Sequence, residues 1–81
     1  MEYFVYIIRG KKGGTYTGFT TDLQRRLKEH NDNLGGYTKG KGPWTLVWYC
    51  VFRDRQMAEN FEMYLKAGSG YAFACKRLIG K

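Results

Sequence analysis

The stretch TYTGFTTDLQRRLKEH, residues 15–30, places a Tyr-x-Gly segment directly before a segment with helical periodicity. The residues before it, YFVYIIR (3–9), are β-branched and aromatic, and GKKGG (10–14) is typical of a turn. We therefore expect residues 3–9 and 15–19 to form an antiparallel β-hairpin that leads straight into a helix.

That helix is predicted within TTDLQRRLKEHNDNLGG (20–36). Thr21, with Gln24 three residues later, has the pattern of a capping box at the N-terminus. The glycine pair Gly35 and Gly36 is typical of a helix C-terminus.

The next strand is predicted in WTLVWYCVFR (44–53). Its nearly continuous apolar character favours burial on both faces, so we expect a central strand. Asp54 is a good N-cap for a second helix, RQMAENFEMYLKA (55–67), which the GSG of 68–70 should end. A short last helix should follow over about 71–79.

The order β-β-α-β-α-α predicts an α+β fold, a small antiparallel sheet flanked by helices, in one domain spanning 1–81. Fourteen Lys and Arg residues against seven Asp and Glu give a formal net charge of +7, which favours a polyanionic partner, nucleic acid above all. A basic surface that only maintains solubility is the alternative. A membrane partner is not expected, because the longest apolar run, LVWYCVF (46–52), is too short to span a bilayer. The N-terminus lacks the features of a signal peptide, so we expect a cytoplasmic protein.

Cys50 and Cys75 lie far apart in the sequence and, with one histidine, cannot build a usual four-ligand zinc site. We expect both to be thiols of the core. A metal, if one is used, should be a hard cation bound by oxygen.

The helical period separates the polar residues of the first helix. His30 shares the apolar stripe, Arg26 lies at its edge, and Arg25 points nearly opposite, toward solvent. The stripe itself consists of Leu23, Leu27 and Leu34. A structural alternative remains for each polar residue: His30 bonded to a backbone carbonyl, and Arg26 extending along the apolar surface with its charge in water.

The second helix has an apolar stripe made of Ala58, Phe61 and Leu65, with Glu62 on one flank. From there Glu62 could reach a cleft along the sheet. The alternative is a surface salt bridge between Glu62 and Lys66, four residues later.

In the hairpin, Tyr6 and Tyr16 could be cross-strand neighbours if the turn is short, with Gly18 leaving room beside them. Seven tyrosines in the chain make simple aromatic packing the default explanation. The same phenols facing an arginine, a histidine and a glutamate could instead form a phosphodiester-cleaving site. In such a site an arginine holds the phosphate and a carboxylate binds Mg²⁺.

These residues together resemble the GIY-YIG nuclease superfamily, in particular its small single-domain bacterial members. The first motif corresponds to FVY (Phe4, Val5, Tyr6) and the second to YTG (Tyr16, Thr17, Gly18). Phe4 stands where the first motif usually has glycine, although small members often carry an aromatic residue there. DLQRRLKEHN resembles the family's arginine-bearing helix, and AENFEMYLKAGSG resembles its glutamate-bearing helix.

The resemblance implies a three-stranded antiparallel sheet flanked by helices and hydrolysis by an activated water with one divalent ion, Mg²⁺ or Mn²⁺. It places the catalytic arginine at Arg26, the frequent histidine at His30 and the metal-binding glutamate at Glu62. We favour Tyr6 as general base, Tyr16 as its support or as the residue that orients water, and His30 as the group that fixes a phenol.

The implied function is a metal-dependent DNA endonuclease, acting on branched or damaged DNA, without haem, flavin or nucleotide cofactor. Weak nucleic-acid contacts are expected from Arg25, Lys39 and Lys41. The alternative is a catalytically weak or inactive module that binds nucleic acid together with a larger repair or recombination protein.

Overall fold

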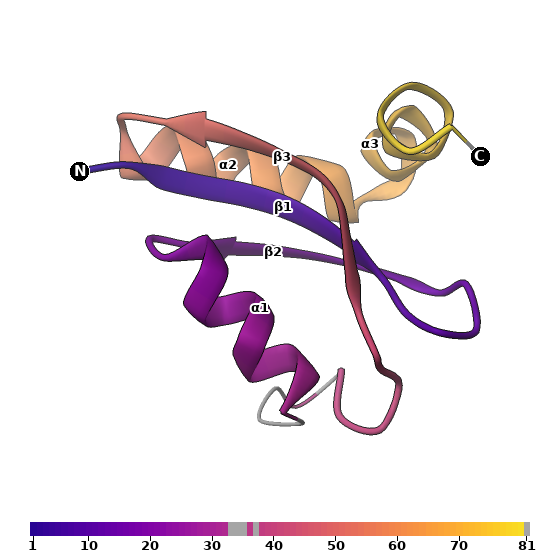
Figure 1. The fold of residues 1–81 in the computed structure, drawn as a ribbon. Helices are drawn as coiled ribbons and strands as arrows, with labels where there is room; N and C mark the ends of the chain where they lie inside the picture. The colour runs from indigo at the N-terminus through magenta and orange to yellow at the C-terminus, as the bar shows by residue number, and fades with distance from the viewer. Residues whose placement is uncertain (33–35, 37, 81) are drawn as a thin grey trace.

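The computed structural model describes residues 1–32, 36 and 38–80 of the 81-residue chain. The elements run in the expected order, β-β-α-β-α-α, closed by a π-helical turn (Figure 1). They are β1 (Tyr3–Arg9), β2 (Thr15–Thr20), α1 (Leu23–Asn31), β3 (Thr45–Phe52), α2 (Arg55–Lys66), α3 (Gly68–Phe73) and η1 (Ala74–Leu78). In the part of the chain so described, none of the helices combines the length and apolar character needed to cross a bilayer.

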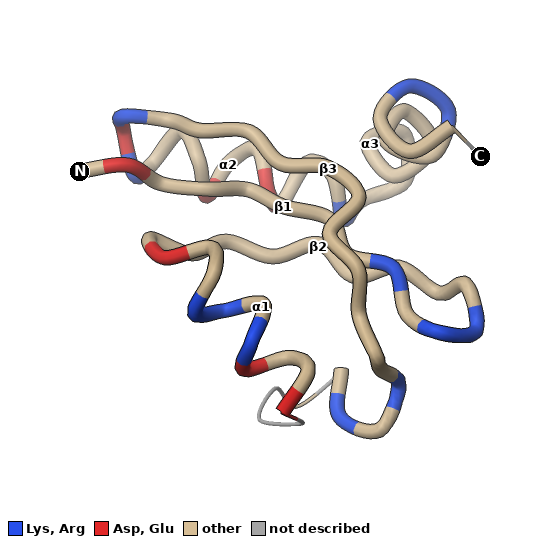
Figure 2. Tube along the Cα trace, in the orientation of Figure 1, with Lys and Arg blue, Asp and Glu red and all other residues tan. Residues whose placement is uncertain are grey.

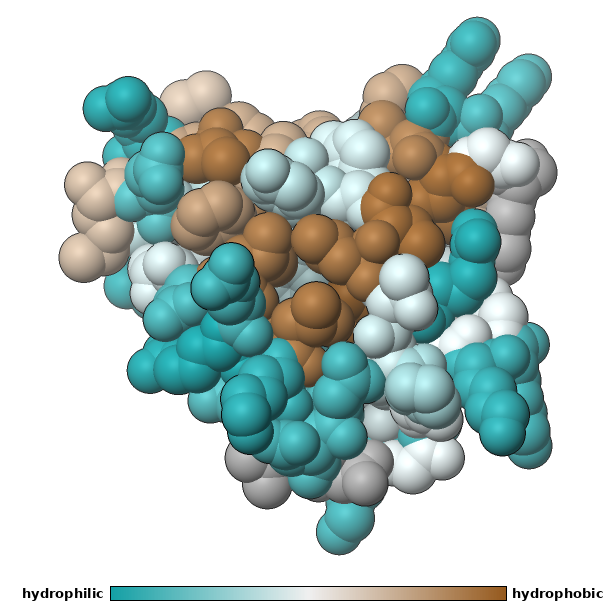
Figure 3. Space-filling model, in the orientation of Figure 1, coloured by the Kyte–Doolittle hydropathy of each residue, from teal (hydrophilic) through white to brown (hydrophobic). Residues whose placement is uncertain are grey.

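The three strands form one antiparallel sheet in the order β2-β1-β3. The prediction that β3 is central and buried on both faces was wrong, because β1 pairs with both other strands and β3 lies at an edge. Tyr49 and Val51 of β3 are 51% and 42% exposed. An apolar run indicates which faces of a strand are buried, but it does not indicate which strands pair with it. Here only one face of β3 is well covered. A hydrophobic band crosses the face of the molecule seen in Figure 3.

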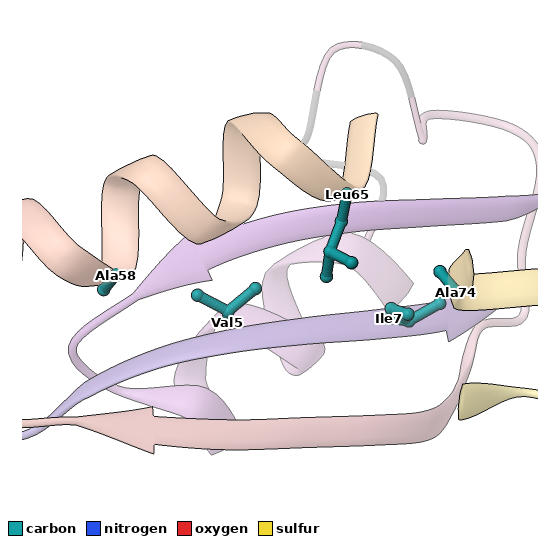
Figure 4. Close-up of a cluster of buried hydrophobic side chains, with 5 residues drawn as sticks. All are labelled: Val5, Ile7, Ala58, Leu65 and Ala74. Carbon is teal, nitrogen blue, oxygen red and sulfur yellow. The ribbon is translucent and has the colours of Figure 1, made fainter. Parts of the chain in front are cut away.

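Alternate residues of β1 face two different helices. Val5 and Ile7 pack into a core formed with α2 and the C-terminal turn, together with Ala58, Leu65 and Ala74 (Figure 4). On the opposite face, Tyr6 and Ile8 join buried Trp44 in a second cluster, against which Leu23 and Leu27 of α1 pack. The apolar stripe of α1 thus faces the sheet as predicted, except for Leu34, which lies outside the described residues.

Both ends of α1 differ from the sequence prediction. The N-cap is Asp22, whose carboxylate accepts a hydrogen bond from the Arg25 N–H at 3.1 Å, rather than Thr21. The helix ends at Asn31, before the glycine pair, of which Gly36 lies in a turn and Gly35 outside the described residues. The Asn31 side chain accepts from the Trp44 N–H at 2.6 Å and donates to its carbonyl at 3.2 Å. Tertiary hydrogen bonds therefore tie the end of the helix to the start of β3.

Asp54 caps α2 as predicted, accepting a hydrogen bond from the Gln56 N–H at 2.9 Å. The prediction that GSG (68–70) separates α2 from a later helix was wrong, because these residues form the first turn of α3. A Cβ at Gly70 would overlap the carbonyl group of Tyr64. Glycine at this position thus allows α3 to pack directly on the end of α2.

The two cysteines are both free and half-buried, and the prediction of a core thiol is confirmed for Cys50 alone. Cys50 packs against the core between the sheet and α2. Burial raises the pKa of its thiol, so it stays protonated and unreactive near neutral pH.

Candidate active site

The strand register determines how the two motif tyrosines meet. Tyr6 lies opposite Gly18, and Tyr16 lies opposite Ile8, so the phenols are offset by two residues on the same face of the sheet. They are not direct cross-strand partners, because the loop between β1 and β2 spans five residues (10–14). Their ring centroids are nevertheless 6.5 Å apart.

The absence of a side chain at Gly18 leaves room for the Tyr6 ring. A Cβ at this position would overlap the phenol oxygen and ring carbon of Tyr6. The Tyr6 side chain therefore lies across the backbone of β2, where only glycine fits. This is the physical reason for a glycine in the second motif.

His30 connects the phenol to the rest of the fold. Its side chain is buried, with 1% of its surface exposed. Nε2 lies 2.7 Å from the Tyr6 hydroxyl, and Nδ1 lies 2.7 Å from the Thr38 hydroxyl. The ring centroid is 5.2 Å from that of Tyr16. The alternative of a histidine bonded to a backbone carbonyl was wrong, since both ring nitrogens bond to side chains.

Thr38 and Trp44 are site residues that the sequence did not reveal. Thr38 is 1% exposed, and its carbonyl accepts a hydrogen bond from the Trp44 indole N–H at 3.1 Å. A threonine in a glycine-rich loop carries no local signal of such a role. Together with the Asn31 hydrogen bonds to Trp44, these contacts hold Thr38 at the Nδ1 side of the His30 ring.

The surroundings push the two bonded groups toward their neutral forms. Burial raises the pKa of Tyr6 to about 12, and the positive charge of Arg26 opposes this only in part. Burial, and then the charge of Arg26, lower the pKa of His30. At neutral pH the pair is therefore a neutral phenol bonded to a neutral imidazole.

The two arginines of α1 have different surroundings, as the helical period predicted. The Arg26 side chain is 31% exposed and donates a hydrogen bond to Glu29 at 3.0 Å. Its charge acts on both Tyr6 and His30. The Arg25 side chain is 68% exposed, with its Nε 3.9 Å from Glu29. Arg26 is therefore the cation placed at the site.

Glu62 approaches from the other face of the sheet, around the edge strand β2. Its side chain is 19% exposed and forms an ion pair with Lys66 at 3.0 Å, which is the salt bridge considered from the sequence. The Lys66 ammonium lies 5.3 Å from the ring centroid of Tyr16. The charge of Glu62 also contributes to the raised pKa of Tyr6. The charge of Glu62 thus acts on Tyr6, and Lys66 links the carboxylate to Tyr16, although α1 and α2 cover opposite faces.

One divalent ion fits this set of donors. Among the described residues no three His, Cys, Asp or Glu side chains gather into a multidentate metal site. Mg²⁺ keeps several waters and is commonly held by one or two carboxylates together with substrate phosphates. A single half-buried carboxylate such as Glu62 suits such an ion, which would compete with Lys66 for the carboxylate.

The remaining predicted residues lie outside the polar cluster. Phe4 packs against Tyr49 with ring centroids 6.1 Å apart, and Val5 belongs to the α2-side core. Thr17 lies opposite Ile7, on the face away from Tyr6. Lys39 is exposed, and Lys41 lines a hollow between two loops.

Comparison with known proteins assigns the family. Residues 2–71 match the GIY-YIG catalytic domain. The chain is 41% identical over 64 residues to UPF0213 protein CPE1444 of Clostridium perfringens, covering 78% of this chain and 69% of that protein. It is 42% identical over 67 residues to UPF0213 protein BH0048 of Halalkalibacterium halodurans, covering 82% and 71%.

The fold agrees as well. The solution NMR structure of UPF0213 protein BH0048 from Bacillus halodurans superposes with a TM-score of 0.60 at 34% identity, covering 96% of this chain and 87% of that one. Sequence and structure lead to the same assignment: the chain belongs to the GIY-YIG family, among the small UPF0213 proteins.

Proposed function

We propose that this protein is a metal-dependent endonuclease that hydrolyses phosphodiester bonds in DNA. The observation that carries the proposal is the buried hydrogen bond between Tyr6 and His30, with the Arg26 cation beside it. A neutral imidazole held at a phenol is an arrangement suited to proton transfer. Membership of the GIY-YIG family supports the same chemistry.

The raised pKa of Tyr6 defines how the phenol can act. A phenolate is scarce at neutral pH when the pKa is about 12. Tyr6 therefore works as a relay: its oxygen accepts a proton from water while its own proton passes to His30 Nε2. This requires the tautomer in which Nδ1 carries the proton and donates to Thr38. The hydroxide oxygen bonds to phosphorus, and the bond from phosphorus to the leaving oxygen breaks. The leaving oxygen takes up a proton from solvent water, and His30 later returns its extra proton to solvent through Tyr6.

Arg26 and Glu62 supply the charges for the phosphate. The Arg26 guanidinium stabilises the additional negative charge of the pentacovalent phosphate. Glu62 would hold one Mg²⁺ or Mn²⁺, which supplies stabilisation of the leaving oxygen. Tyr16 lies against His30 and supports the ring or orients the water.

The substrate follows from charge. A net charge of +7 favours a polyanion, and the site holds phosphate-directed groups rather than an element that reads base edges. We therefore propose low sequence specificity, with recognition of branched or damaged DNA by shape.

Cleavage of labelled single-stranded, duplex and forked DNA with Mg²⁺ or Mn²⁺ tests this function. Tyr6→Phe and Glu62→Gln should abolish cleavage and leave DNA binding in place. Glu59→Gln is the matched control, because Glu59 lies on the same helix and pairs with Arg55 at the surface. Binding to all three DNAs without cleavage of any would contradict the proposal. Cleavage that survives Glu62→Gln would indicate a contaminating nuclease.

The ion pair of Glu62 with Lys66 favours a second candidate function. A carboxylate that stays paired with lysine binds no metal, and the protein would then hold nucleic acid without cutting it, as a module of a larger repair or recombination complex. The same assay separates the two functions, because this second candidate predicts binding without cleavage at every Mg²⁺ concentration.

A further inference from the structure

The positive charge of the two main helices is largely neutralised within the helices. Five ion pairs bridge residues three or four apart: Arg25 and Arg26 with Glu29, Lys28 with Asp32, Arg55 with Glu59, and Lys66 with Glu62. By contrast, the stretches 9–14 and 36–44 hold five of the fourteen basic residues and none of the seven acidic ones. Figure 2 shows this contrast, with blue but no red in both loops.

The two basic loops enclose one hollow of about 510 Å³. Lys11 and Lys12 from the β1–β2 loop and Lys41 from the loop before β3 line it, and its apolar part includes the Trp44 ring. Within the described part of the chain, neither Lys11 nor Lys12 forms an ion pair. Lys11 and Lys12 therefore bring to the hollow positive charge that no acidic side chain of the described residues pairs with.

The walls of the hollow are fixed by packing between the two loops. A Cβ at Gly10 would lie 2.7 Å from the Lys41 carbonyl oxygen and 3.3 Å from the Trp44 ring. The two loops thus pack against each other at a glycine. Trp44 is 4% exposed and anchored by Asn31 and Thr38, so this wall is fixed.

The wall of the hollow is continuous with the Tyr6–His30 site. Thr15 lines the hollow, whereas the side chain of the next residue, Tyr16, lies on the other face of β2 and packs against His30. Trp44 lines the hollow and bonds to Thr38, which bonds to His30. Through these hydrogen bonds the hollow lies next to the residues that hold His30, and one nucleic-acid strand can contact both regions.

We propose that this hollow binds a phosphate of the nucleic-acid strand that flanks the scissile phosphate. The location relative to the cleaved bond rests on the proposed nuclease function. The Lys11 and Lys12 ammonium groups supply the charge for a phosphodiester, and glycine-rich walls let the sugar–phosphate backbone come close. The Trp44 ring, which packs beneath Gly10, fixes the apolar wall of the hollow.

The first test maps binding without any cleavage. Backbone amide NMR spectra of the full chain in EDTA are titrated with inorganic phosphate, with thymidine monophosphate and with a short single-stranded oligothymidylate. We expect the Gly10, Lys41 and Gly42 signals to shift with the oligonucleotide at concentrations where the two small ligands have no effect. Unshifted loop signals would overturn the proposal. Equal shifts with the mononucleotide would overturn it too, since they would indicate a site for free nucleotides.

The second test measures charge neutralisation by the loop. The double variant Lys11→Ala/Lys12→Ala should weaken oligonucleotide binding and lower the slope of log affinity against log salt by about 1.4, or about 0.7 for each phosphate contact on a single strand. Lys76→Ala/Arg77→Ala in η1 removes the same charge away from the hollow and should change the slope far less. Equal slopes in the two variants would contradict a local site.

Both measurements are made without divalent ions, so they stand apart from the nuclease assay. A protein that never cleaves DNA can still bind it in the hollow. A protein that cleaves DNA normally but shows no loop shifts would retain the proposed function and lose the proposed subsite.

Discussion

The Tyr6 hydroxyl lies 2.7 Å from His30 Nε2, and this hydrogen bond joins the central strand to α1 across a buried face of the sheet. Burial disfavours the charged form of both the Tyr6 phenol and the His30 imidazole, and the phenol proton lies in the hydrogen bond between them. The bond is therefore a structural tie within the core and a path for proton transfer, and the two roles respond differently to pH and to substitution.

The lowered pKa of His30 predicts a stability that falls in acid. As the pH decreases through about 6.5, the unfolded chain takes up a proton that the folded chain resists. The free energy of unfolding should thus be full above that pH and decline below it until the folded pKa is reached. Urea unfolding at several pH values should show this decline in the native chain but not in His30→Gln. Parallel pH profiles for the two proteins would contradict a buried neutral histidine.

The rate of DNA cleavage should depend on the protonation state of His30. A protonated His30 cannot accept the proton of Tyr6, so kcat/KM for DNA should fall in acid with the pKa of His30, which lies below its ordinary value. Measuring the rate from pH 5 to 9 tests this. An acidic limb centred above about 6.5 would argue against His30 as the acceptor.

Gly18→Ala should displace the Tyr6 ring. The added methyl group would overlap the phenol, so we expect a loss of about 1–3 kcal/mol in unfolding free energy, typical of overpacking. Gly14→Ala is the control, because a Cβ there meets nothing within 4 Å. Equal stability of the two variants would indicate that Tyr6 has another accessible position.

Arg26→Ala should lower kcat by about 10²- to 10³-fold, as expected for loss of a preorganised group that stabilises transition-state charge. Arg55→Ala removes an equal charge from an exposed helical ion pair and should leave kcat within about twofold of the native value. Steady-state cleavage at saturating DNA separates this effect from binding. Similar losses in both variants would reduce the role of Arg26 to bulk charge.

Lys66→Met should tighten the binding of Mn²⁺. The ammonium pairs with Glu62, and a helical ion pair worth about 0.5 kcal/mol competes with a divalent ion by about twofold or more. Calorimetric titration with Mn²⁺ measures the change, and Lys28→Met, which removes an exposed pair with Asp32, is the control. Weaker binding in Lys66→Met would mean that the lysine supports the ion rather than competing with it.

The sequence by itself determined the element order, the Asp54 cap and the separation of Arg26 from Arg25. Each of these depends on local propensity or on the helical period, which short stretches of chain encode. It also brought Tyr6, Tyr16, Arg26, His30 and Glu62 together as candidates through their motifs. The structure places the first four in one cluster, and Glu62 is linked to it through Lys66, whose ammonium lies over the Tyr16 ring.

Only the tertiary structure decided the strand order, the offset of Tyr6 from Tyr16 and the partners of His30. An apolar run in β3 suits a central or an edge strand equally, because pairing is set by contacts between distant residues. The register followed from the length of the loop at 10–14, and Thr38 reached His30 through a loop that Trp44 and Asn31 hold in place. Periodicity shows which face of an element is apolar, whereas the side chain that meets a buried histidine depends on how the whole chain packs.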